Sequence, residues 1–296
     1  MKVVGDTTVI DELHNGVHVN VTGSGPNTVV LIHGFSDNLS TWRRLVPALA
    51  LSHRVIAIDL PSHGLSTREW RHPLLDSYVD VVEEILDAYD VRGRISLIGN
   101  SMGGAVSALF AHQHPQRVDG VVVIGMPGVT GVPRAWRVAA SRPAAAAVKA
   151  VTAPIPLPIL RTAFAWAYTH AAVPHAGSVD PATLTSYTGS YPDRARLFEL
   201  HPLARALMRD LRRVHLDRVL QELRMPVLQL WGRYDPLVPA RHAPNGAANI
   251  AVLPGCGHCP QLDAPDLVLQ HVLPFLTTAH LAVPDETAEA TSASGA

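Results

Sequence analysis

The sequence predicts an α/β protein with a mostly parallel central sheet, helices on both faces and an inserted helical cap. Short runs of β-branched residues alternate with helix-forming segments in the first half of the chain, which is typical of parallel sheets. These runs are apolar throughout, as expected of strands covered on both faces. A long segment, residues 127–224, then interrupts the alternation, and two more apolar runs follow it.

The chain opens with a predicted hairpin. Residues 3–21 alternate loosely, and Asn15-Gly16 divides them with a strong two-residue turn signal, so two antiparallel strands are expected. Continuous apolar runs beyond it predict buried strands at residues 28–32, 54–58, 95–98, 118–124, 226–231 and 249–253. The pattern between and after them predicts helices at residues 40–51, 77–89, 105–112 and 264–277.

Residues 127–224 form the predicted cap. Connections between neighbouring elements are usually short, so a segment of this length must carry structure of its own. We assign residues 1–126 and 225–279 to one core, and residues 127–224 to a helical lid inserted into it. Residues 280–296 are rich in Pro, Thr, Ser and Ala and lack apolar periodicity, so a disordered tail is expected.

The overall charge is nearly balanced. Lys and Arg total 24 and Asp and Glu total 25, which argues against nucleic acid or an acidic polymer as a partner. No stretch reaches the roughly 18 apolar residues of a membrane span, and no signal peptide is recognisable, so a soluble cytoplasmic protein is expected. Two cysteines are too few for a disulfide scaffold or a four-ligand zinc site. We expect no metal and no organic cofactor, and the oligomeric state stays open.

A glycine-rich turn carries the predicted nucleophile. The run Gly99-Asn100-Ser101-Met102-Gly103 joins a buried strand to a helix. A serine at the tip of such a turn adopts a strained backbone conformation, and only glycine fits two residues before and after it. The turn raises the Ser101 hydroxyl above the sheet. It also places the Met102 N–H at a helix N-terminus, where it can stabilise an oxyanion.

Asp235 and His258 are the predicted acid and base. A serine nucleophile needs a base within hydrogen-bond reach and an acid that orients the base. Each of the two residues directly follows a predicted buried strand. The carboxyl ends of parallel strands share one edge of a sheet, so both are expected beside Ser101. No Asp or Glu lies between Asp119 and Asp180, which leaves Asp235 without a rival after the preceding strand.

The second oxyanion donor is expected after the first buried strand. His33-Gly34-Phe35 follows that strand, and the Phe35 N–H is the candidate beside the Met102 N–H. We expect His33 itself to pack or hydrogen-bond within its own loop, and residues 59–66 to shape a turn.

Motifs along residues 28–276 occur in an order typical of one family. They are His33-Gly34, Asp59-Leu60-Pro61 before His63-Gly64 and Ser66, the Gly99–Gly104 turn, Trp231-Gly232 before Asp235, and Gly257-His258 before Pro260. This set resembles the α/β-hydrolase superfamily, in its serine-nucleophile branch of esterases and lipases. The resemblance implies a Ser101-His258-Asp235 triad, an oxyanion hole at Phe35 and Met102, and a lid in the insertion. Serine at position 101 argues against the branches with a carboxylate nucleophile, epoxide hydrolases and haloalkane dehalogenases.

The residues around His258 bear on two further interpretations. The Gly99–Gly104 turn is similar to that of carbon–carbon hydrolases of ring-cleavage products, but those usually carry Trp after the catalytic His, where this chain has Cys259. Cys256-Gly257-His258-Cys259 also matches a disulfide-isomerase motif, yet it lies late in the sheet and precedes proline, which disfavours redox catalysis. We hypothesise that a disulfide between the cysteines, or a thiophilic metal bound to them, would inactivate the enzyme.

The insertion is apolar and basic. Every charged residue between positions 120 and 179 is basic: Arg134, Arg137, Arg142, Lys149 and Arg161. Most of these are expected on a solvated face. Phe164, Trp166 and Tyr168 lie together in an apolar stretch and are the predicted substrate-binding residues. The composition suits a hydrophobic or anionic ester, and it is compatible with weak contact to an anionic membrane surface.

These patterns favour hydrolysis of a carboxylic ester of a hydrophobic small molecule through an acyl-enzyme. Two alternatives stay open. One is carbon–carbon bond hydrolysis of a vinylogous diketone from ring cleavage. The other is ligand binding with little turnover, because the fold alone does not determine activity.

Overall fold

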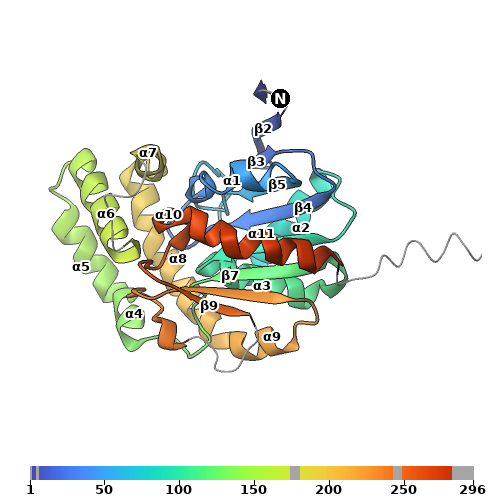
Figure 1. Cartoon of the computed structure of the whole chain (residues 1–296). Coiled ribbons are helices and arrows are strands. Elements are labelled where there is room, and N and C mark those ends of the chain that lie inside the picture. The colour runs from blue at the N-terminus through green and yellow to red at the C-terminus, as the bar shows by residue number, and fades with distance from the viewer. Residues whose placement is uncertain (1, 5–6, 174–180, 243–248, 282–296) are drawn as a thin grey trace, which may run out of the picture.

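The structure, a computed structural model, describes residues 2–4, 7–173, 181–242 and 249–281. Its strands form one 9-stranded sheet in the order β1-β2-β3-β5-β4-β6-β7-β8-β9 (Figure 1). The pairs β1–β2, β2–β3 and β3–β5 are antiparallel. All other neighbouring strands, from β5 through β4 to β9, pair in parallel. The bounds are β1 (Lys2–Val4), β2 (Thr7–His14), β3 (Val17–Thr22), β4 (Asn27–Ile32), β5 (His53–Ile58), β6 (Ile95–Asn100), β7 (Val118–Ile124), β8 (Val227–Gly232) and β9 (Ile250–Leu253). The predicted fold class is confirmed.

Asn15 and Gly16 form the predicted hairpin turn between β2 and β3. Both have positive φ angles, 47° and 79°, as a type I′ turn requires. His14 and Val17 pair directly across the turn. The hairpin places β3 against β5 and covers what would otherwise be an open edge of the parallel sheet.

The prediction of one helix over residues 40–51 is wrong, because this segment contains two short helical elements. The structure has a 3₁₀ turn, η1 (Leu39–Trp42), followed by a one-turn helix, α1 (Val46–Leu49). Pro47 lies in the first turn of α1, where its missing N–H costs nothing, and in the interior of a longer helix the same ring would break a hydrogen bond. The side chain of Asn38 caps η1 by accepting a hydrogen bond from the Ser40 N–H.

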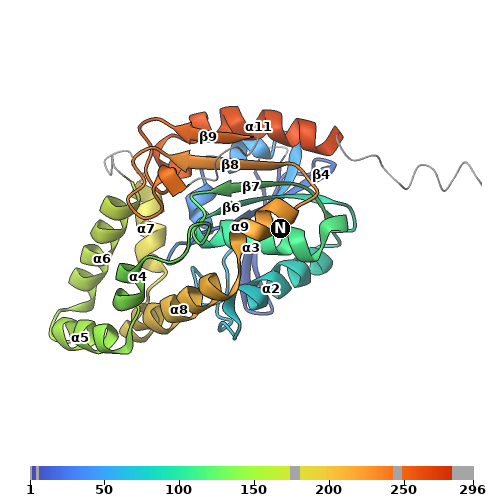
Figure 2. The same ribbon diagram turned by 90° about the horizontal axis from the view of Figure 1, so that it is seen from below.

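The two faces of the sheet carry two separate cores. Along β4, Val30 and Ile32 join the core under α2 and α3, whereas Val29 and Leu31 join the core under α1 and α11. This alternation follows from the two-residue period of a strand. Figure 2 shows α11 on one side of the sheet and α2, α3 and α9 on the other. The helices of these layers are α2 (Leu74–Ala88), α3 (Met102–Gln113), α9 (Leu216–Glu222), α10 (Pro260–Asp263) and α11 (Pro265–Leu281).

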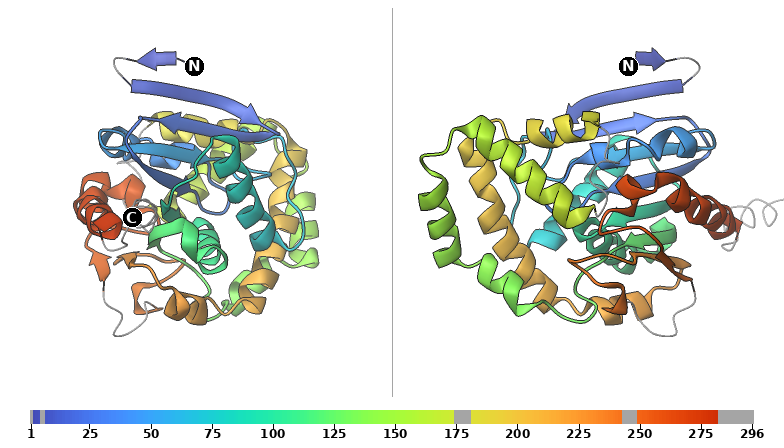
Figure 3. Two further views of the ribbon diagram at one scale, coloured as in Figure 1. Left: turned by 90° about the vertical axis from the view of Figure 1, so that its right-hand side faces the viewer. Right: turned by 60° about the vertical axis from the view of Figure 1, so that its left-hand side comes forward.

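The segment between β7 and β8 rises beyond the carboxyl ends of the strands (Figures 1 and 3). Before α9 it contains α4 (Arg134–Ala139), α5 (Arg142–Thr152), α6 (Leu157–Ala172), α7 (Pro181–Gly189) and α8 (Arg194–Arg213). Helix α8 joins the two regions, because Leu200 packs with Tyr187 outside the sheet while Leu207 and Leu211 enter the core beside α3. Helix α9 packs on α3. The assignment of residues 127–224 to one lid therefore stays a prediction.

The carboxyl-terminal end of the described chain is helical. Helix α11 continues to Leu281, so the expected disorder does not begin at residue 280. The remainder of the predicted tail, residues 282–296, lies outside the described residues. Within the described ranges, no helix combines the length and apolar character needed to cross a membrane.

Candidate active site

Ser101 lies at the tip of a strained turn between β6 and α3. Its φ and ψ are 53° and −115°, a region that costs a residue other than glycine about 1–3 kcal/mol. A Cβ at Gly99 would lie 2.2 Å from the Gly103 carbonyl oxygen, and one at Gly103 would lie 2.1 Å from that of Ile32. The Ser101 N–H donates to the Ile124 carbonyl over 2.7 Å. The strained conformation is therefore held by close backbone contacts and by β7.

Asp235 and His258 lie together at the same edge of the sheet. The Nδ1–H of His258 donates to Asp235 Oδ2 over 2.8 Å, and both residues are buried. The other carboxylate oxygen accepts the N–H groups of Leu237 and Val238, each over 2.8 Å. These two backbone donors thus hold Asp235 in place as an acceptor for the His258 ring. With Nδ1–H as the donor, Nε2 is the nitrogen that can take a proton.

One apolar cavity of about 360 Å³ contains Ser101 and His258 in its lining. Phe35, Phe164 and Tyr168 also line it. The roles of Phe35 in the oxyanion hole and of Phe164 and Tyr168 in substrate binding stay predictions. Helix α8 adds the carbon-rich side chains of Leu200, Ala204, Leu207 and Met208 to the wall. Such a cavity suits an apolar substrate that reacts at a single polar point.

Trp166 is not part of this cavity. Its side chain is 62% exposed and stacks on His170 of the same helix. Phe164 and Tyr168 are four residues apart and share one face of α6, whereas a residue midway between them points away from that face. The prediction of Trp166 as a substrate-binding residue therefore gains no support from its position.

The two predicted oxyanion donors belong to segments next to Ser101: Met102 follows it in the chain, and a Cβ at Gly34, beside Phe35, would lie 3.3 Å from the Ser101 Cβ. Met102 is the first residue of α3, and Phe35 lies in a turn in which the Asp37 N–H donates to the Gly34 carbonyl. Within the described ranges, the N–H groups of Phe35 and Met102 donate to no protein acceptor. Both amides are thus available in the way that oxyanion stabilisation requires. Their assignment to an oxyanion hole remains a prediction.

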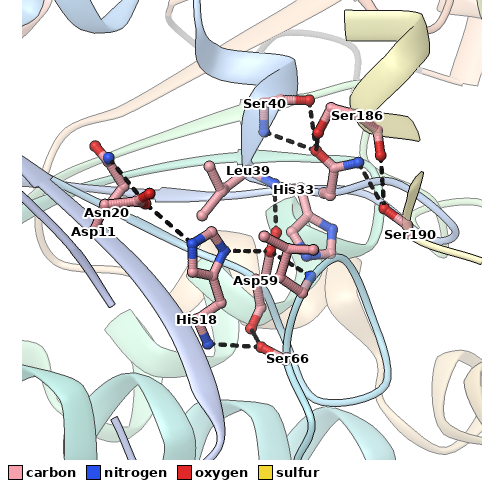
Figure 4. A network of polar contacts seen from close by, with 12 residues as sticks. Asp11, His18, Asn20, His33, Leu39, Ser40, Asp59, Ser66, Ser186 and Ser190 are labelled. Carbon is pink, nitrogen blue, oxygen red and sulfur yellow. Dashed lines mark hydrogen bonds and ion pairs between the residues drawn. The ribbon is translucent and has the colours of Figure 1, made fainter. Parts of the chain in front are cut away.

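A polar network supports the loop that carries Phe35. His33 donates from Nδ1 to the Gly34 carbonyl over 2.7 Å and accepts the Leu60 N–H at Nε2 over 3.0 Å. In Figure 4, Asp59 lies between His18 and Leu39. One carboxylate oxygen of Asp59 is hydrogen-bonded to the His18 ring, and the other accepts the Leu39 N–H over 2.6 Å. These contacts match the structural roles expected for His33 and for residues 59–66. Ser186 of α7 and Ser190, just after the end of α7, are both labelled in Figure 4. Each hydrogen-bonds to the side chain of Asn38.

Sequence reasoning missed Asp37, a buried carboxyl group in the lining of the cavity. Its side chain accepts the hydroxyl of Tyr168 over 2.8 Å and the Asn38 N–H over 2.9 Å. Burial raises the pKa of Asp37 above its usual value, and these hydrogen bonds oppose the rise. Its position shortly after β4 could have identified it in the sequence as a candidate site residue, because functional groups of parallel sheets lie at the carboxyl ends of the strands.

Asn100 was also missed as a positioning residue. Its amide donates to the Ile124 carbonyl over 3.2 Å and to the His258 carbonyl over 3.0 Å. Its oxygen accepts the Cys259 thiol over 3.6 Å. One side chain therefore ties the turn that carries Ser101 to the loop that carries His258.

The structure gives no support to a bond or shared metal at the two cysteines. Both are free and buried, Cys256 in the core under α11 and Cys259 in a small cluster beside α6. Burial raises the pKa of Cys256 to about 11 and that of Cys259 well above its usual value, so both thiols are protonated at neutral pH. In the described part of the chain, no three His, Cys, Asp or Glu side chains form a group that could hold a metal ion.

Comparisons with known proteins show the family and the fold of the chain. A family model described as the alpha/beta hydrolase fold matches residues 27–265. An uncharacterised protein of Mycobacterium tuberculosis is 30% identical over 288 residues, which cover 90% of this chain and 80% of that protein. A pimeloyl-[acyl-carrier protein] methyl ester esterase of Nitrosomonas europaea is 28% identical, with 84% of this chain and 95% of that protein covered.

Two further proteins are similar to this chain, one in the sequence of a shorter segment and one in its fold. A 2-hydroxy-6-oxo-2,4-heptadienoate hydrolase of Pseudomonas putida is 38% identical over 124 residues, 40% of this chain and 44% of that protein. The crystal structure of Cfl2 from Burkholderia cenocepacia superposes with a TM-score of 0.72 at 21% identity, covering 91% of this chain and 95% of that one. At that identity the structural match concerns the fold alone.

Proposed function

The chain belongs to the α/β-hydrolase family, and from this premise we propose that it cleaves a carboxylic ester of a hydrophobic small molecule through an acyl-enzyme. One observation carries the proposal. His258, hydrogen-bonded to the buried Asp235, lines the same apolar cavity as Ser101.

The proposed chemistry begins when the Ser101 hydroxyl attacks the ester carbonyl. His258 takes the hydroxyl proton on Nε2, and Asp235 stabilises the resulting imidazolium through Nδ1–H. The N–H groups of Phe35 and Met102 stabilise the oxyanion. His258 returns the proton to the departing alcohol, which leaves an acyl group on Ser101. Water, deprotonated by His258, then releases the acid and restores the serine.

The relatives support an ester as substrate. The Nitrosomonas europaea relative aligns over most of both chains and is named for an ester. The apolar wall contributed by α6 and α8 favours a carbon-rich acyl group, because burying apolar surface contributes about 25 cal/mol per Å².

Carbon–carbon bond hydrolysis of a ring-cleavage product is the second candidate. The Pseudomonas putida relative and the Gly99–Gly104 turn favour it. Cys259 stands where those enzymes usually carry tryptophan, and it is buried against Tyr168 and Asn100. Ester hydrolysis therefore remains the preferred proposal.

The testing experiment combines labelling with rates. We expect one fluorophosphonate adduct by intact-protein mass, and turnover of 4-nitrophenyl esters that peaks at one chain length. Both should be lost in Ser101→Ala and kept in Ser24→Ala, a matched change at an exposed serine. A vinylogous diketone, assayed in parallel, tests the second candidate. A folded parent protein with neither adduct nor turnover would contradict hydrolysis and favour a ligand-binding role.

A further inference from the structure

A second hollow, of about 560 Å³, lies beside the catalytic cavity and is lined mainly by arginine. We call it the arginine groove. Its lining residues are Arg137, Ala140, Ser141, Arg142, Arg205, Met208, Arg209, Arg212 and Arg213. Helix α8 supplies four of the six arginines, spaced so that they share one face, and the end of α4 with the start of α5 supplies the other two. No acidic residue lines the groove.

The positive charge of the arginine groove is largely uncompensated. Arg213 is paired with Asp76, but within the described ranges the other five arginines form no ion pair with a carboxylate. Helix α5 begins in the groove with no acid in its first turn, so its dipole adds to the positive potential. The whole chain has a formal net charge of −1, so this concentration is local. A concave site lined by one sign of charge attracts the opposite charge.

The arginine groove adjoins the catalytic cavity. Ala140 and Met208 line both hollows. His201 lines the cavity one helical turn before Arg205, about 6 Å along α8. The positive charge of Arg205 contributes, after burial, to lowering the pKa of His201, so the field of the groove reaches the cavity wall. The two hollows are therefore neighbours, and a ligand long enough to pass Ala140 and Met208 would occupy both.

We propose that the arginine groove binds a phosphate group at the far end of the substrate, while the ester lies at Ser101. This inference rests on the proposed function and names its substrate class, an apolar ester with a phosphate-bearing end. A carboxylate is satisfied by one guanidinium, whereas a phosphate offers more charge and more acceptor oxygens to several. A concave, convergent site also favours a compact group over the flat surface of a membrane.

The test compares two series of 4-nitrophenyl esters of increasing chain length, one ending in a methyl group and one in a phosphonate. We expect kcat/KM to favour the phosphonate by about tenfold or more at the best length, and the preference to weaken with added salt. In Arg205→Gln/Arg209→Gln the ratio should fall towards one. In Arg218→Gln/Arg224→Gln, which removes the same charge from exposed sites outside the groove, the ratio should stay at the parent value. A ratio near one in the parent, or an equal fall in both variants, would overturn the proposal.

Two further measurements separate this inference from its premises. The first is a calorimetric titration that compares the affinity for decyl phosphate with the affinity for decanol. This measurement does not require the protein to turn over an ester. If no ester is hydrolysed, loss of decyl phosphate binding in Arg205→Gln/Arg209→Gln alone still supports the groove. Sedimentation with vesicles of equal parts phosphatidylglycerol and phosphatidylcholine tests a membrane surface instead. Vesicle binding that depends on these arginines, with the ester ratio unaffected, would contradict the proposal.

Discussion

At the scale of single residues, Asp37 is the unusual group in the cavity. It is a nearly fully buried carboxyl whose pKa burial raises, with the Tyr168 hydroxyl and the Asn38 N–H as its donors. A raised pKa in the folded state means that the folded protein prefers the protonated form more strongly than the unfolded chain does. The stability that Asp37 contributes is therefore greatest below the unfolded pKa, near 3.8, and is lost as the pH rises through the higher folded value.

Asp37→Asn should change the pH dependence of stability. The amide oxygen can replace only one of the two acceptor oxygens, Oδ1 for the Asn38 N–H or Oδ2 for the Tyr168 hydroxyl, and the amide cannot ionise. We expect the free energy of unfolding of the variant, relative to the parent, to increase as the pH rises from roughly 4 towards neutrality. Urea unfolding at a series of pH values measures this difference. Asp80→Asn, at an exposed position on α2, is the control and should show no such trend. A pH-independent difference for Asp37→Asn would contradict the account.

At the scale of elements, the turn between β6 and α3 depends on its two glycines. The carbonyl oxygens of Ile32 and Gly103 lie where Cβ atoms would be at positions 103 and 99. Both carbonyls belong to the packed backbone, so neither can move as a flexible side chain could. The close approach of β4, β6 and α3 therefore holds Ser101 in its strained conformation.

Gly103→Ala should destabilise the protein by about 3 kcal/mol or more, because the added methyl group overlaps the backbone of β4. Gly93→Ala is the matched control, since nothing lies within 4 Å of the added Cβ. We expect the control to stay within about 0.5 kcal/mol of the parent. Urea denaturation measures both, and fluorophosphonate labelling shows whether Ser101 is still presented. Equal, small effects at the two positions would refute the packing argument.

At the scale of the whole molecule, the cavity lies between two parts of the chain. The loops after β4, β6 and β9 contribute the proposed reacting groups, and α6 and α8 contribute the apolar wall. Tyr191 and Tyr168 link the two parts through hydrogen bonds to the Ser36 carbonyl and to Asp37. The shape of the acyl site thus depends on how the helices between β7 and β8 pack on the sheet.

Ala204→Leu should shorten the preferred acyl chain. Ala204 lines the cavity from α8, and a larger side chain there removes space from its apolar end. One methylene in an apolar pocket changes specificity by about tenfold or more, so the rate for long esters should fall at least that much relative to short ones. Initial rates on 4-nitrophenyl esters of increasing length measure the shift. Ala146→Leu, the same change at an exposed position of α5, should leave the profile as it is.

By itself the sequence determined where the strands lie along the chain, the opening hairpin and the strand-end positions of Ser101, Asp235 and His258. It could do so because these features rest on contiguous patterns, and because parallel strands end at one edge of the sheet. The tertiary structure alone decided which side chains meet across the cavity. Asp37 and Tyr168, which share a hydrogen bond, are 131 residues apart in the chain. Phe164 lines the cavity and Trp166, two residues later on α6, does not. The arginine groove is formed where α4 and α5 meet α8. Such contacts depend on the packing of distant segments, which no local pattern specifies.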